Sequence, residues 1–184
     1  NVALNRGTFQ ISTAVNAGSP TVNATSGGTG TVVMNGLNSV LQFISGGSAT
    51  FGNSIMIEAG NPIAILNNNN QNNTTTGSLT FGGAPGDQGQ TLNVQGGGNT
   101  IQISGATNLG PAGNAIILAN STTNINLAGV VSGSATLVKE GGQTLALLGT
   151  SAVQAGGTQV VPTASNTYSG GTFLLGGTLQ ANIA

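Results

Sequence analysis

The sequence predicts an all-β protein whose short strands are stacked in coils, a β-solenoid with about 20–24 residues per coil. Three observations support this prediction: apolar residues recur in short alternating triplets, glycine is abundant between them, and helix-forming residues are scarce. Of the 184 residues, 32 are Gly, and charged residues make up only 3%. Because Gly interrupts every window of helical length and Lys, Arg and Glu are nearly missing, helices are not expected.

Each triplet has the form apolar–x–apolar and is followed within a few residues by Gly or Asn. Alternate side chains of a strand point to opposite faces, so each triplet sends its two apolar groups inward and its middle residue outward. In chain order the triplets are Phe9-Gln10-Ile11, Leu41-Gln42-Phe43, Ile55-Met56-Ile57, Ile63-Ala64-Ile65, Leu79-Thr80-Phe81, Leu92-Asn93-Val94, Ile101-Gln102-Ile103, Ile125-Asn126-Leu127 and Leu145-Ala146-Leu147.

The spacing of the triplets favours coils over a β-sandwich. Residues Leu79, Ile101, Ile125 and Leu145 follow one another at steps of about 20–24, with a further strand inside each step. A sandwich normally has hairpin turns, larger aromatic residues and a charged outer face, whereas aromatic residues here make up 3% of the chain. The glycines are therefore expected at the corners between strands, where tight bends are needed.

Residues 1–184 are expected to form a single β-solenoid domain with loop insertions near 67–76 and 150–165. The first segment contains an Asn-rich run from Asn67 to Asn73, which suits either an Asn ladder or, as we expect, a solvent-exposed loop. The second contains a short predicted strand, Thr158-Gln159-Val160-Val161, that ends at Pro162.

The charge inventory excludes several classes of function. Arg6 and Lys139 are the only basic residues, so neither nucleic-acid binding nor a polybasic membrane patch is expected. No apolar run approaches the length of about 20 residues that a membrane-spanning helix needs, so membrane insertion is not expected. The chain has no Cys, which excludes disulfides and thiolate metal sites, and no cofactor or metal is expected.

The chemistry needed for catalysis is also sparse. There is no His to act as a general base, which excludes a Ser-His-Asp triad. The remaining titratable side chains are Glu58, Asp87, Glu140 and Tyr168 besides the two basic residues. A pair of carboxylates at a glycosidase site would require Glu58 and Asp87 to align, yet their separation is not one coil period. The chain is therefore expected not to be an enzyme.

A more specific signal lies in the last fifty residues. A Leu-x-Lys-x-Gly segment beginning at Leu137 leads into Leu-x-Leu, and later come Asn-Thr-Tyr-x-Gly-Gly-Thr and Gly-Thr-Leu. This pattern resembles the autotransporter-associated β-strand repeat, over about a quarter of the chain. Residues 150–165 are inserted between its two halves. The motif positions, which the resemblance assigns a structural role, are Lys139, Gly141, Leu145, Leu147, Asn166, Tyr168, Gly170, Gly171, Thr172, Gly177, Thr178 and Leu179.

The resemblance implies a right-handed parallel β-helix exposed on the surface of a Gram-negative-type bacterium. Within it, Lys139 is expected to face solvent beside Glu140, or alternatively to form an ion pair that faces a partner. Tyr168 is expected to pack at a corner.

Two functions follow as hypotheses. The first is a structural segment or subunit of an extracellular filament, in which copies of the chain stack head to tail through uncapped solenoid ends. The second is an adhesin that binds a surface ligand through the 67–76 or 150–165 loops. Ice binding is not expected, because Thr pairs such as Thr74 and Thr76 do not recur at the coil spacing.

Overall fold

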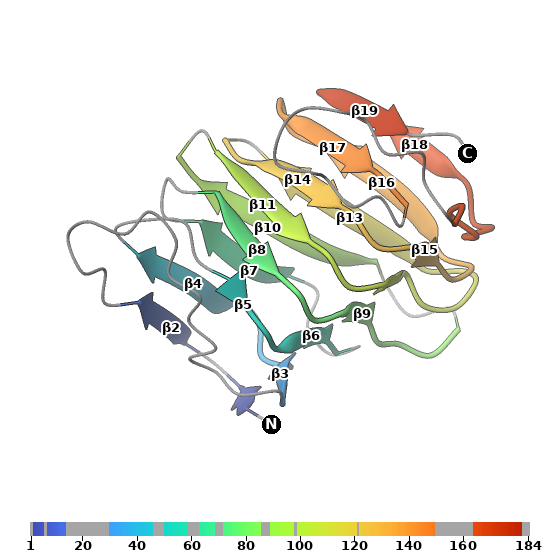
Figure 1. The fold of residues 1–184 in the computed structure, drawn as a ribbon. Helices are drawn as coiled ribbons and strands as arrows, with labels where there is room; N and C mark the ends of the chain where they lie inside the picture. The colour runs from blue at the N-terminus through green and yellow to red at the C-terminus, as the bar shows by residue number, and fades with distance from the viewer. Residues whose placement is uncertain are drawn as a thin grey trace.

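A computed structural model describes residues 2–5, 7–13, 30–45, 50–58, 63–68, 72–85, 89–97, 99–120, 122–149 and 164–181. Within these ranges the chain forms strands and turns, and no helix. The strands belong to three parallel sheets that run along the axis on which the coils are stacked, with the two ends of the chain at opposite ends of the stack (Figure 1).

Each sheet contains strands from successive coils. Sheet A contains β1 (Val2–Leu4), β3 (Thr31–Met34), β6 (Ser54–Ile57), β9 (Leu79–Phe81), β12 (Thr107–Asn108) and β15 (Val131–Ser132). Sheet B contains β2 (Thr8–Thr13), β4 (Ser39–Ser45), β7 (Ile63–Asn68), β10 (Gln90–Gly96), β13 (Ala115–Asn120), β16 (Thr136–Glu140) and β18 (Thr172–Leu174). Sheet C contains β5 (Thr50–Phe51), β8 (Asn73–Thr75), β11 (Thr100–Ile103), β14 (Asn124–Leu127), β17 (Thr144–Leu147) and β19 (Thr178–Ala181).

The chain visits the sheets in the repeating order A, B, C from β3 to β17, and each strand pairs in parallel with its counterpart in the next coil. This arrangement confirms the predicted β-solenoid. The predicted coil length also holds in the regular region, where Ile101 pairs with Ile125 and Ile125 pairs with Leu145. Some coils are longer, since Leu137 pairs with Thr172 across a step that includes residues 150–163, which lie outside the described part.

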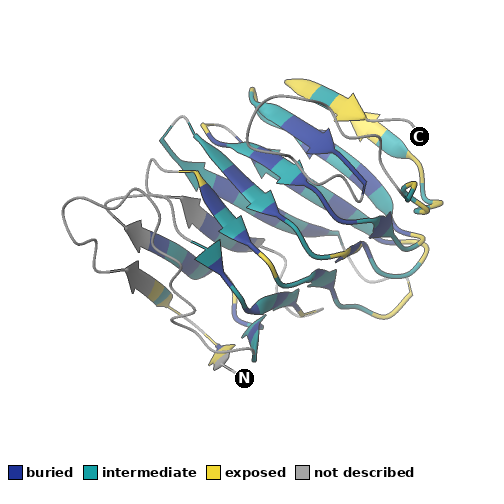
Figure 2. Cartoon of the chain, viewed as in Figure 1, coloured by how far each residue is buried: buried dark blue, intermediate teal, exposed yellow. Residues whose placement is uncertain are grey.

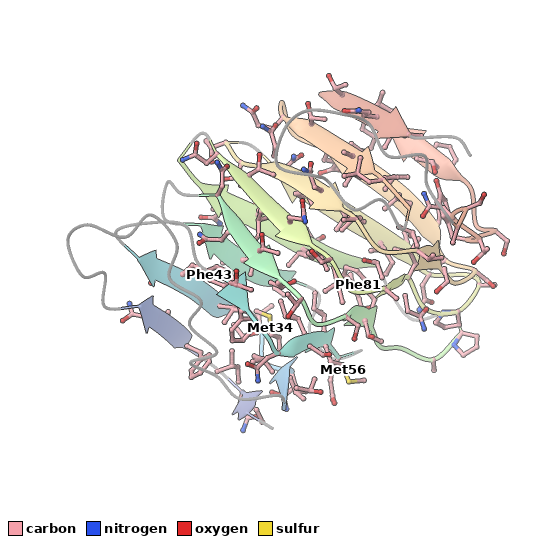
Figure 3. All side chains as sticks on the ribbon, in the orientation of Figure 1. Met34, Phe43, Met56 and Phe81 are labelled. Atoms are coloured by element: carbon pink, nitrogen blue, oxygen red, sulfur yellow. The ribbon has the colours of Figure 1, made fainter. Side chains whose placement is uncertain are left out.

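One continuous apolar core lies between the three sheets. Buried and partly exposed residues alternate along most strands, as expected when one face of each strand points inward (Figure 2). Inside, the rings of Phe43 and Phe51 meet edge to face with centroids 5.9 Å apart. Met34 and Phe81 are also fully buried, whereas Met56 is partly exposed on the outer face of sheet A (Figure 3).

Glycines at the corner between sheets C and A allow the coils to approach closely. Gly77, Gly105 and Gly129 occupy equivalent positions in successive coils. A Cβ atom on Gly105 would lie 2.4 Å from the carbonyl oxygen of Gly77, and one on Gly129 would lie 2.2 Å from that of Gly105. Real Cβ atoms do not approach carbonyl oxygens this closely, so only Gly fits without a backbone shift. The predicted placement of glycines at corners is confirmed for this ladder, which we call the glycine corner.

Two predictions about strand faces were wrong. In β7 it is Ala64 and Leu66 that are buried, whereas Ile65 is partly exposed, because Ala64 and Leu66 pair with the inward residues Leu92 and Val94 of β10. In β17 the middle residue Ala146 was expected to point to solvent but is 3% exposed, in a small cluster with Ala128 and Leu148.

The Asn-rich segment is mainly strand where the structure describes it, and not a loop. Residues 67–68 end β7, and Asn73 and Thr75 of β8 point inward with 1% exposure each. Residues 69–71 lie outside the described part. The same holds for residues 150–163, including the strand predicted at Thr158–Val161, so these expectations stay predictions.

Candidate functional site: the last coils and their open edge

Lys139 lies in the interior of the solenoid, which overturns the expectation that it faces solvent. It occupies an inward position of β16, in the same row as Leu118 of β13 and Leu174 of β18. Its exposed fraction is 0%. Strand alternation explains the placement, because Lys139 follows the buried Leu137 by two residues and must share its face.

The ammonium group of Lys139 binds three backbone carbonyl oxygens at the corner between sheets B and C. Nζ donates to the oxygens of Glu140 at 2.5 Å, Gly141 at 2.8 Å and Gly176 at 3.1 Å. These bonds use all three donors of the ammonium group. Because Gly176 belongs to the next coil, the side chain connects two coils. Lys139 was predicted to face solvent or to form an ion pair that faces a partner, and its side chain does neither.

The surroundings of this ammonium group are tight. A Cβ atom on Gly177 would lie 2.9 Å from Nζ and 2.4 Å from the oxygen of Gly141, and Gly177 has a φ of 70°. Burial lowers the pKa of Lys139, and attraction to Glu140 partly opposes this effect. The corner therefore holds a buried ammonium group that is stabilised by three carbonyl oxygens and by attraction to Glu140.

The preceding coil has a neutral counterpart of this connection. Asn120 is fully buried, and its Nδ2 donates to the oxygens of Thr123 and Thr144, each at 3.0 Å. Thr144 in turn donates its backbone N–H to Oδ1 of Asn124 at 3.0 Å. Side chains thus link the coils of β13 to β17 in addition to the backbone ladders. Neither Asn was predicted as a structural link.

The Asn-Thr-Tyr part of the motif lies against β15. Oδ1 of Asn166 accepts a hydrogen bond from the backbone N–H of Val131 at 2.8 Å, and Thr167 donates its N–H to the oxygen of Val131 at 2.8 Å. The ring of Tyr168 packs against the core, and its hydroxyl lies 2.6 Å from Oγ1 of Thr172. This part of the motif therefore lies beside β15, the terminal strand of sheet A, and leads into β18.

The other motif positions have ordinary structural places. Leu145 and Leu147 are buried in β17, Leu179 packs against the core from β19, and Thr178 begins that strand. At Gly170 a Cβ atom would lie 2.1 Å from the oxygen of Ala135, and Gly171 has a φ of 80°.

The last coil leaves apolar side chains uncovered. β18 and β19 are terminal strands of sheets B and C, so one edge of each has no strand beside it in the described part. Phe173, Leu174 and Leu175 are 60%, 51% and 67% exposed. Leu174 is a core residue by its position in the inward row, and it is exposed because no further coil covers it. We call β18, Leu175 and β19 the open edge.

Glu58 lies apart from Lys139 and Glu140 in the chain and is exposed. Its backbone oxygen accepts a hydrogen bond from Nε2 of Gln90 at 2.8 Å, and its backbone N–H donates to the oxygen of Met34 at 3.0 Å. Arg6 and Asp87 lie outside the described part. In the described ranges no group of three or more His, Cys, Asp or Glu is placed to hold a metal ion. No helix there is long and apolar enough to cross a membrane.

Comparisons of the chain with protein-family models, with curated proteins and with solved structures gave no match.

Proposed function

We propose that this chain is a non-enzymatic structural β-solenoid that stacks head to tail with copies of itself into an extracellular filament. The observation that carries the proposal is the open edge, where three consecutive large apolar residues are more than half exposed. An uncovered parallel strand that carries an uncovered core residue, Leu174, favours pairing with a further coil.

The two ends of sheet B support a contact of the head-to-tail type. β2 is the terminal strand at one end and β18 at the other, and the strands between them all run in parallel. A copy placed beyond β18 in the same orientation therefore presents β2 to it as another parallel strand. Such a contact joins two different surfaces and does not close on itself, so it generates a linear polymer.

The charge of the chain also suits stacking. Two basic and three acidic residues give a net charge of −1, so copies repel each other little. Placement on the surface of a Gram-negative-type bacterium rests on the resemblance of residues 137–180 to the autotransporter-associated repeat.

The adhesin alternative has less support. One of its two candidate loops contains Asn73 and Thr75, whose side chains are buried and so cannot contact a ligand. The other falls within residues 150–165, nearly all of which lie outside the described part. Neither function predicts catalysis.

The proposal is tested by replacing Leu174 with Asp in the full chain. Sedimentation velocity over a wide range of concentrations, with electron microscopy of the same samples, should show elongated polymers for the unchanged chain. We expect Leu174→Asp to remain monomeric, because a carboxylate in the stacking face must be desolvated. The matched control is Leu37→Asp, which changes a leucine that is 52% exposed outside the open edge and should leave assembly intact. A strictly monomeric unchanged chain at high concentration would refute the proposal.

A further inference from the structure

We infer that the open edge binds β2 of a second copy of this chain in one register, with Gly7 placed on Leu174 and Phe9 placed on Gly176. This inference rests on the proposed function and specifies its contact. The internal register of sheet B determines the alignment, since each strand of that sheet sits on the preceding one with inward residues in continuous rows.

The first of these rows runs through the whole of sheet B. Its members are Ser39, Ala64, Leu92, Leu118, Lys139 and Leu174. Towards the start of the chain the row continues to Gly7, because Thr8 pairs with Val40 and Gly7 precedes it. Stacking two copies as one continuous solenoid therefore places Gly7 of one copy on Leu174 of the other.

The side chains in this register are complementary in size. Leu174 is 51% exposed, so a further coil could bury it. A Cβ atom built on Gly7 would meet nothing within 4 Å, so there is open space beside Gly7 for that side chain. Phe9 is only partly buried at the opposite end, and the row to which it belongs ends at Gly176, which has no side chain. A shift of the second copy by two residues would keep the same faces inward but place Phe9 on Leu174, so the inward rows of sheet B would not continue from one copy to the next in the alignment that they keep within the chain.

The outward row provides a chemical test of the register. Leu175 aligns with Glu140, because its N–H donates to the oxygen of Lys139 at 2.9 Å. The same row begins at Thr8, which is exposed, so the inferred contact places Thr8 of one copy beside Leu175 of the other. Paired residues of adjacent strands lie about 4.8 Å apart, within the range of about 4.4–6.8 Å that a disulfide spans between Cα atoms.

The experiment uses the absence of Cys from the chain, so that every thiol is an introduced one. The double variant Thr8→Cys/Leu175→Cys is oxidised under assembly conditions and run on denaturing, non-reducing gels. We expect a ladder of covalent oligomers that reducing agent removes. The matched control is Gln10→Cys/Leu175→Cys, in which the first thiol lies two residues, or about 6.6 Å, further along β2. The Cα atoms of its two Cys residues are then more than about 7 Å apart, beyond the distance that a disulfide spans, and we expect a several-fold lower yield.

The outcomes separate this inference from the proposed function. If sedimentation shows assembly but the Gln10 variant cross-links as well as or better than the Thr8 variant, the register is wrong while the filament proposal stands. If the single variant Leu175→Cys gives covalent dimers as readily as the double variant, the open edges meet each other and both proposals fail. If the unchanged chain does not assemble, both fail as well.

Discussion

At the scale of single residues, the ammonium group of Lys139 connects two coils through its hydrogen bonds. Replacing it by Met keeps the apolar stem but leaves the oxygens of Glu140, Gly141 and Gly176 without their donor. Because unpaired acceptors in a buried corner are costly, we expect Lys139→Met to lower the free energy of unfolding by about 1–3 kcal/mol. Urea denaturation followed by circular dichroism measures this loss.

A control at the next residue separates the lost hydrogen bonds from a general effect of Met in β16. Val138 is paired in the same strand but its side chain is on the outer face of sheet B, so Val138→Met should change the free energy of unfolding by no more than about 0.5 kcal/mol. Equal losses in the two variants would contradict the role assigned to Lys139.

The same residue predicts a pH dependence with a definite sign. Burial lowers the pKa of Lys139 below its usual value of 10.5 in the folded protein. Between the lowered pKa and 10.5, the unfolded chain binds more protons at this residue than the folded chain, so its titration raises the free energy of unfolding as pH increases. The Lys139→Met variant lacks this titration. Urea denaturation of both proteins from neutral pH to above 10.5 should therefore show their difference in stability growing with pH, and a shrinking difference would refute the assignment.

At the scale of elements, the glycine corner determines how closely successive coils pack. Gly105→Ala would place a Cβ atom 2.4 Å from the oxygen of Gly77, which the rigid backbone cannot avoid without a shift. We expect a loss of about 1–3 kcal/mol in the free energy of unfolding. Gly142→Ala is the matched control, since a Cβ atom there meets nothing within 4 Å. That change should be neutral or stabilising by up to about 1 kcal/mol, because Ala restricts the unfolded chain. Similar losses at both glycines, measured in urea, would show that the close approach does not matter.

The sequence predicted those strands in which apolar residues alternate with other residues. All nine triplets lie in strands, because period-two alternation reports directly on an inward and an outward face. β12 and β15 have two residues each, too few for any pattern, and they are strands only because neighbouring coils pair with them. These two strands could not be predicted, because they depend on pairing with neighbouring coils and not on their own sequence.

The candidate site was less predictable than the fold. Lys139 was expected to face solvent because the family resemblance of its segment implied this, and its burial was not predicted. The alternation of Leu137 and Lys139 contained the correct signal. Two of the carbonyl oxygens that bind the ammonium group come from the next two residues, Glu140 and Gly141, but the third comes from Gly176, which only the stacking of coils brings close. Exposure of Leu174 likewise follows from the position of β18 at the end of sheet B and not from its local sequence.

At the scale of the whole molecule, each coil contacts only its neighbours, so stability is expected to depend on position along the stack. A coil in the middle, such as that of β13 and β14, is paired on both sides, whereas β18 and β19 are paired on one. The last coil should therefore open locally at lower free energy than the middle coils. In hydrogen–deuterium exchange of the monomer, amides of β18 and β19 should exchange faster than those of β13 and β14.

Assembly should reverse this order at the open edge. If a second copy covers β18, backbone N–H groups at its open edge acquire acceptors and Leu174 becomes buried, so exchange in β18 slows as concentration rises. Exchange in β13 should stay unchanged, because that strand is already paired on both sides. Hydrogen–deuterium exchange below and above the concentration at which polymers form measures the difference. In Leu174→Asp, which should not assemble, exchange in β18 should remain fast at every concentration. Protection that spreads evenly over all coils would instead indicate lateral association of the rods, since only end-to-end stacking confines the change to the terminal strands.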